Sequence, residues 1–289
     1  MYCTKLLIGF LLATLNFTAV DRSFERESYL QCRDSLTVML GRAGSDKERA
    51  EVLWRLSRVT LMLGEKAGTK ESKQAFFSEG VRFADEARSA DPANVASYMW
   101  HCANLGRECQ TRSVKDKIAA VPVLEWDLET ILDRFGCTDY SEAWQALSEL
   151  YHSHPFKSND KAVGFARKAV DTIPRDEVRI TTYLNLAYLL YERNNSASRR
   201  ASSLASDAGR FKVSGQKNTE RFGYYAGAGD PQGKAPWSVR PLAELSDRQE
   251  ALLLVEYAIR KYEGASRRTK MDARDYRTLQ SLQQQWKNN

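Results

Sequence analysis

The residues most able to do chemistry are two histidines in the run His152-Ser153-His154-Pro155. Side chains two positions apart point to different faces of a helix, and the sequence places no cluster of cysteine or carboxylate ligands beside them. The third histidine, His101, stands at an expected core position of a helix, so we interpret it as a packed side chain. The sequence therefore predicts no metal site.

Catalytic and nucleotide-binding patterns are not found in the sequence either. The glycines from Gly223 to Gly233 match neither a phosphate-binding loop nor a dinucleotide fingerprint. No two carboxylates are spaced in a way that predicts an acid and a base. We therefore expect a protein that is not an enzyme, that needs no cofactor and that works by binding.

Composition fits a folded globular chain. Of 289 residues, 43% are hydrophobic and 28% are charged, with 16 glycines and 7 prolines. These values exclude a disordered, a collagen-like and a polytopic membrane protein. The net charge of +6 is uneven, because residues 192–289 contain 18 lysine and arginine residues against 11 acidic ones. We interpret Arg199, Arg200 and the run Arg267-Arg268 as solvated, and we expect no nucleic-acid partner.

The first 20 residues resemble an export segment. Lys5 precedes the largely apolar stretch from Leu6 to Val20, which is shorter than the roughly 20 residues needed to span a bilayer. We expect a signal peptide or an N-terminal anchor over residues 1–20, and export to a bacterial periplasm or cell envelope. In an exported chain, a disulfide could form among four cysteines: Cys32, Cys102, Cys109 and Cys137. Their spacing does not determine which of them would pair.

Helical periodicity with internal repetition dominates residues 24–213. Trp144-x-x-Leu147-Ser148-x-x-Tyr151 is followed by Ala162-x-x-x-Ala166-x-x-Ala169, and the next unit repeats this as Tyr183-x-x-Leu186-Ala187-x-x-Leu190 and Ala201-x-x-x-Ala205-x-x-Ala208. An earlier helix shows Gly80-x-x-x-Ala84-x-x-Ala87. Small residues at this spacing allow two antiparallel helices to approach closely, so we expect consecutive helix pairs.

These motifs resemble the tetratricopeptide repeat family over about residues 46–213. The third and fourth units match best, and the first begins at Leu53-x-x-Leu56-Ser57 with about ten extra residues from Gly64 to Lys73. The second unit is degenerate, with Pro122 inside its helix over residues 117–135. The resemblance implies an all-α fold, a right-handed α-solenoid of about four helix pairs with capping helices at both ends.

The predicted domain organisation follows from these features. The repeat domain covers residues 24–213, a loop rich in glycine, proline and aromatic residues covers 214–241, and capping helices cover 242–289. Ser246 and Gln249 form a predicted capping box at the start of the first capping helix. The aromatic residues of the 214–241 loop predict that it packs on the rest of the chain.

The resemblance also implies a concave groove lined by the first helix of each pair. The groove residues that we predict are Trp54, Arg58, Met62, Met99, Gln145, Glu149, Leu184, Tyr188 and Tyr191. Arg58 is the single cation placed there, so the groove does not favour a clamp for a peptide carboxylate. An apolar helix, an extended segment or a small apolar ligand fits the groove better. In the alternative interpretation, the chain's own 214–241 segment covers these aromatic residues.

Two functions are compatible with the sequence. The first is an exported scaffold that binds another protein through the groove. The second is an accessory component of a solute transporter, because Leu53-Trp54-Arg55-Leu56-Ser57, Trp144-x-x-Leu147-Ser148-Glu149 and Asp160-Lys161-Ala162 resemble the T-component of TRAP-type transporters. That resemblance implies a small apolar ligand, a periplasmic solute-binding partner and a homo-oligomer. The repeats and the Trp100 helix are also similar to eukaryotic regulators of microtubule dynamics, which implies shared architecture.

Overall fold

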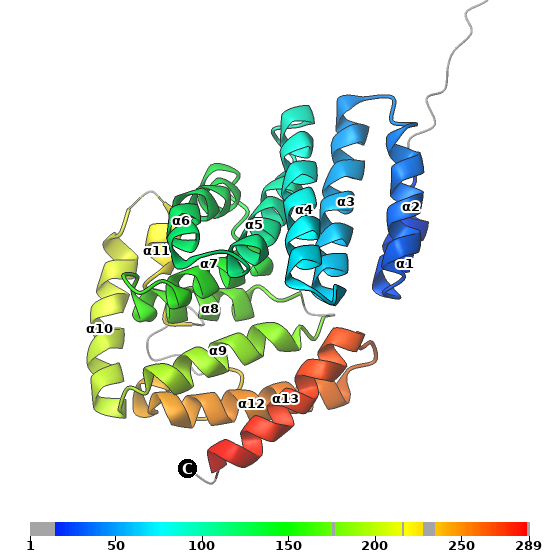
Figure 1. The fold of residues 1–289 in the computed structure, drawn as a ribbon. Helices are drawn as coiled ribbons and strands as arrows, with labels where there is room; N and C mark the ends of the chain where they lie inside the picture. The colour runs from blue at the N-terminus through cyan, green and yellow to red at the C-terminus, as the bar shows by residue number, and fades with distance from the viewer. Residues whose placement is uncertain (1–14, 175–176, 216, 228–234, 288–289) are drawn as a thin grey trace, which may run out of the picture. The chain divides into compact units, whose positions relative to one another are not determined.

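The computed structural model describes residues 15–174, 177–215, 217–227 and 235–287 (Figure 1). The chain divides into two compact units, Met1–Ser113 and Val114–Asn289. All regular elements in the described ranges are helices. The predicted all-α fold class is therefore confirmed, and the solenoid of four repeats remains a proposal.

The described residues of the first unit, 15–113, form five helices: α1 (Thr18–Glu25), α2 (Tyr29–Leu40), α3 (Asp46–Lys66), α4 (Lys70–Ala90) and α5 (Val95–Gln110). Helices α3, α4 and α5 each begin after a side chain that caps the free backbone N–H groups of the first turn: Ser45, Thr69 and Asn94. Helices α3 and α4 lie side by side as a long pair (Figure 1). The extra residues from Gly64 to Lys73 lengthen both helices, and only residues 67–69 separate them.

Small side chains bring α3, α4 and α5 into close contact. The Ser57 hydroxyl donates to the Gly80 carbonyl oxygen at 2.7 Å, and the Asn104 amide donates to the Ser57 carbonyl at 3.1 Å. Ser57 and Asn104 are fully buried. This polar contact joins all three helices inside the apolar packing of the unit.

The second unit contains α6 (Val114–Glu129), a π-helical turn (Thr130–Arg134), α7 (Ser141–Ser153), α8 (Asn159–Asp171), α9 (Ile180–Arg193), α10 (Ala197–Val213), α11 (Asn218–Phe222), a 3₁₀ turn (Leu242–Glu244), α12 (Asp247–Gly264) and α13 (Lys270–Lys287). Pro122 lies inside α6 without ending it. The capping box predicted at Ser246 and Gln249 is present at the start of α12. Helices α7 and α8 form a pair, and α9 packs against α8, α12 and α13 (Figure 1).

Five charged side chains form a buried network in the second unit. Glu250 of α12 accepts two hydrogen bonds of 2.6 Å from Arg167 and also bonds Arg200. Asp247 accepts two bonds of 2.8 Å from Arg193. Arg200 is 2% exposed, so the prediction of a solvated side chain there was wrong. Its charge is stable in the interior because two carboxylates, Asp247 and Glu250, surround it.

The described part of the 214–241 segment packs on the second unit, as its aromatic residues predicted. Trp237 is buried and donates its ring N–H to Glu250 at 3.3 Å. Helix α11 places Phe222 against Trp144, with the ring centroids 5.1 Å apart. The segment is therefore held by α12 at one end and by the α7–α8 pair at the other.

The N-terminal segment predicted over residues 1–20 lies largely outside the described residues, which begin at Leu15. Helix α1 crosses the expected end of that segment, and its Val20 side chain is 5% exposed. None of the helices in the described ranges combines the length and the apolar composition needed to cross a membrane.

Candidate functional site

The predicted groove residues divide between the two units. Trp54, Arg58 and Met62 lie on α3 and Met99 lies on α5, all in the first unit. The other five lie on α7 and α9 in the second unit: Gln145, Glu149, Leu184, Tyr188 and Tyr191.

On α3 the predicted groove face is covered by the chain's own N-terminal helices. Trp54 and Met62 pack beside a core that includes Val20 of α1 and Leu36 of α2. The indole N–H of Trp54 donates to Glu51 at 3.0 Å. The sequence predicted that these side chains line a groove, and in the structure α1 and α2 pack on this face.

Arg58 binds a carboxylate of its own chain. Its guanidinium donates to Asp21 at 2.6 Å, and Arg55 donates to both oxygens of Asp21 at 3.3 Å. Burial by itself would raise the pKa of the Asp21 carboxyl, but the hydrogen bonds from the two arginines outweigh it and lower the pKa below its usual value. Asp21 is therefore held as an anion between two cations.

Met99 belongs to the packed interior of the first unit. Its side chain is 8% exposed on α5, where Tyr98 and Cys102 are also buried. A side chain this deeply packed contributes apolar contacts within the unit and offers little surface to a ligand.

Side-chain hydrogen bonds join helices α7 and α9, which carry the second set of groove residues. The Thr182 hydroxyl donates to the Gln145 side-chain oxygen at 2.8 Å, and the Gln145 amide donates to Glu149 at 2.9 Å. Asn185 donates to Ser148 at 3.2 Å. These bonds fix the register of the two helices and the directions of their outer side chains.

The outer part of this surface is accessible. Tyr188 is 38% exposed and Glu149 is exposed. Sequence reasoning did not place His152 and Glu192 together, yet the His152 imidazole lies 2.9 Å from the Glu192 carboxylate. The α7–α9 face, as we use the term, consists of Gln145, Glu149, His152, Leu184, Tyr188 and Glu192.

One edge of the α7–α9 face is closed by the last helix. Trp286 of α13 stacks on Tyr191 with the ring centroids 4.1 Å apart and the planes at 6°. It also meets the edge of Tyr188 at 6.0 Å. The cover over these tyrosines therefore comes from α13, whereas the alternative interpretation assigned it to the 214–241 segment.

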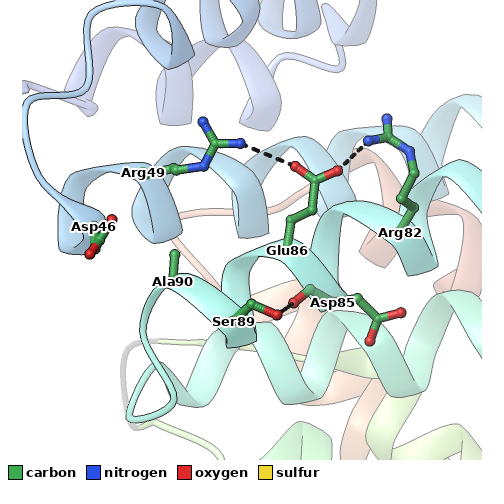
Figure 2. Close-up of a pocket in the computed structure, with 7 residues that line it drawn as sticks. All are labelled: Asp46, Arg49, Arg82, Asp85, Glu86, Ser89 and Ala90. Atoms are coloured by element: carbon green, nitrogen blue, oxygen red, sulfur yellow. Dashed lines mark hydrogen bonds and ion pairs between the residues drawn. The ribbon is translucent and has the colours of Figure 1, made fainter.

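A separate open hollow of about 430 Å³ lies between the start of α3 and the end of α4 (Figure 2). Figure 2 shows the Glu86 carboxylate between Arg49 and Arg82, at 3.3 Å from Arg49 and in an ion pair with Arg82. These ion pairs lie on an open surface, where such pairs contribute little to stability. The hollow contains no pair of groups arranged for acid–base or nucleophilic chemistry.

Metal binding has no candidate in the described ranges, where no three histidine, cysteine, aspartate or glutamate side chains gather closely enough to hold an ion. Three cysteines in these ranges are buried, Cys32, Cys102 and Cys109, and Cys137 is half-buried.

Two comparisons with known proteins return the same family. The family model described as "Regulator of microtubule dynamics protein 1-3" matches residues 17–129. Regulator of microtubule dynamics protein 1 from Bos taurus is 23% identical over 161 residues, which cover 50% of this chain and 51% of the relative. The chain thus spans about half the length of the curated relative that it matches. No solved structure matches the chain significantly.

The predicted bacterial location was wrong. The curated relative is a bovine protein, and a eukaryotic cell has no periplasm. These comparisons also give no support to the resemblance to a transporter component. They do support the similarity to regulators of microtubule dynamics, which was inferred from the repeats and the Trp100 helix. The chain is similar over its first unit and α6 to a helical family named for the regulation of microtubules.

Proposed function

We propose that this chain is a non-catalytic helical scaffold that binds another protein through the α7–α9 face. The observation that carries the proposal is that Tyr188 of α9 and Glu149 of α7 are both exposed, on two helices that side-chain hydrogen bonds join. Rigid helices that display an aromatic side chain with a polar rim are typical of protein interfaces.

The charge of the α7–α9 face favours a basic partner segment. Glu149 and Glu192 are both exposed, and the His152 imidazole lies 2.9 Å from the Glu192 carboxylate. Leu184 and Tyr188 of α9 add apolar area to the same face, Leu184 half-buried and Tyr188 exposed. A segment with one large apolar side chain and flanking lysines or arginines would complement this arrangement.

Site-specific cross-linking tests the proposal. A photoreactive phenylalanine analogue is introduced at Tyr188, and in a matched control at Gln285, which is exposed on α13. We expect cross-links to one protein from position 188, lost when Glu149 is also changed to Arg. Equal cross-linking from both positions, or no cross-link from position 188, would show that this face is not the binding surface.

Microtubule association is a second candidate function. It is favoured by the names of the matched family and relative and by the exposed cations of α10, among them Arg199, Arg210 and Lys212. The test is co-sedimentation with stabilised microtubules at increasing salt, because a contact through exposed cations weakens as salt rises. The variant R210E/K212E should reduce pelleting, while E149R should not. If wild type and R210E/K212E pellet equally, the cations of α10 do not bind microtubules and this second candidate function is contradicted.

A further inference from the structure

Helix α1 binds the face of α3 through three anchors on one side. Phe17, its N-cap residue, lies under the Arg55 guanidinium at 3.9 Å, and Phe24 lies under Arg58 at 3.9 Å. Between them Asp21 accepts hydrogen bonds from both arginines. Positions 17, 21 and 24 follow the i, i+4, i+7 spacing by which an amphipathic helix anchors in a groove.

The contact surface of α1 is small. Val20 is the one buried residue among its eight, and the Asp21 side chain remains 37% exposed. Helix α2, in contrast, inserts Cys32 and Leu36 as fully buried side chains. A helix of eight residues is unstable in water by itself, so α1 depends for its conformation on its contacts with both α3 and α2, where the Cys32 thiol donates to the Val20 carbonyl oxygen at 3.5 Å.

The junction between α1 and α2 contains a residue in an uncommon backbone conformation. Glu27 has a left-handed backbone with φ of 60°, which residues other than glycine rarely adopt, and Lys66 holds its carboxylate at 3.0 Å. A right-handed conformation at Glu27 would allow α1 and α2 to continue as one helix. That change would lift α1 away from α3 without unfolding either helix.

We propose that the α3 face formed by Trp54, Arg55 and Arg58 is a helix-binding site that α1 occupies in cis and that a partner helix occupies in trans. The partner is an amphipathic helix with a carboxylate between two aromatic side chains, at positions −4 and +3 from the carboxylate. Two converging guanidiniums select the carboxylate, and their flat faces select the aromatic rings. This site lies in the first unit and is distinct from the α7–α9 face.

Peptide binding to the full chain tests this site. The probe is a fluorescent peptide of residues 15–28, and its binding is measured by fluorescence anisotropy. In the variant D21K the cation at position 21 meets Arg55 and Arg58, so α1 should leave α3 and the probe should bind at least ten times more tightly than to wild type. The matched control is D34K, an equal charge change at an exposed position of α2, which should behave as wild type.

Two further variants show where the probe binds. Adding Arg58→Glu to D21K should abolish binding, and a peptide with Asp21→Lys should bind none of the chains. The double variant F17A/F24A releases α1 without a charge change, so it replaces D21K if circular dichroism shows D21K to be unfolded. It should also bind the probe more tightly than wild type does.

Three results would overturn the proposal. The first is that wild type, D21K and F17A/F24A all bind the probe with the same affinity, or that none of them binds it. The second is binding to D21K that survives Arg58→Glu. The third is a wild-type dimer, seen by light scattering, that D21K converts to a monomer, because the face would then belong to α1 of a second copy.

Discussion

Gly80 of α4 lies so close to Asn104 of α5 that a Cβ atom on Gly80 would be 2.1 Å from the Asn104 side-chain oxygen. Asn104 in turn donates to Ser57 of α3, whose hydroxyl donates back to the Gly80 carbonyl. The glycine thus allows three helices to share one polar contact in a buried position. Any side chain at position 80 must break that contact or separate α4 from α5.

Gly80→Ala should destabilise the first unit by about 2 kcal/mol, because a methyl group forced into a packed contact displaces buried polar atoms. The measurement is urea unfolding followed by circular dichroism. Gly106→Ala is the matched control, since Gly106 is also helical in the first unit and a Cβ there meets nothing within 4 Å. It should be neutral or stabilising by about 0.5 kcal/mol. Equal stability of the two variants would contradict the packing described here.

Glu250→Gln should destabilise the second unit by about 3–5 kcal/mol. The substitution removes the carboxylate that Arg167 and Arg200 share in the interior, and it leaves two guanidiniums with a deficit of negative charge. Glu244→Gln serves as control, because Glu244 is exposed and pairs with Arg240 at the surface. The control should change the free energy of unfolding by less than about 0.5 kcal/mol. Similar losses in both variants would contradict a structural role for the network.

The same carboxylate makes stability depend on pH. Burial by itself would raise the pKa of Glu250, but Arg167 and Arg200 outweigh it and lower the pKa below its usual value of 4.5. The unfolded chain therefore takes up the proton first as pH falls. The contribution of Glu250 to stability is complete above pH 4.5 and is lost as pH falls from there through the folded-state pKa.

Unfolding of wild type and Glu250→Gln at several pH values measures this contribution. The difference in free energy of unfolding should be constant between pH 7 and about pH 5 and should narrow below pH 4.5. Glu244→Gln should keep its small difference from wild type throughout. If the difference in free energy of unfolding between wild type and Glu250→Gln is as large at pH 3 as at pH 7, the lowered pKa of Glu250 does not contribute to stability as described.

Local sequence signals predicted the helices well. The capping residues and the spaced small residues act within a few positions of one another, so the α3–α4 pair and the start of α12 could be inferred from residues that are neighbours in the chain. The extra residues near Gly64 were also visible, although the pattern did not show that they extend helices.

Long-range partners could not be predicted. Arg200 was interpreted as solvated because its charge partner Glu250 lies 50 positions later in the chain. The predicted groove included the α3 face because residues 15–20 were assigned to an export segment, so the spacing of Phe17, Asp21 and Phe24 was not recognised. Composition and periodicity describe a helix surface, but they do not state which other segment covers it.

Helix α8 offers a test of how the 214–241 segment is held. Gly164 faces α11 so closely that a Cβ would be 2.7 Å from the Gly223 carbonyl oxygen and 2.9 Å from that of Phe222. Both contacts are to backbone, which cannot rotate away as a side chain can. Gly164→Ala should therefore push α11 off α8 and weaken the contact between Phe222 and Trp144.

Limited trypsin digestion measures this release, because Lys217 and Arg221 lie in or beside α11. Forcing an extra methyl group into a packed contact typically costs about 1–3 kcal/mol. If the free energy of local opening falls by about 1.4 kcal/mol, the rate of cleavage should rise about tenfold. Gly209→Ala is the control, since a Cβ at this position of α10 meets nothing within 4 Å. Cleavage near residue 221 that is equally slow in both variants would mean that α11 is held by contacts other than its close approach to Gly164.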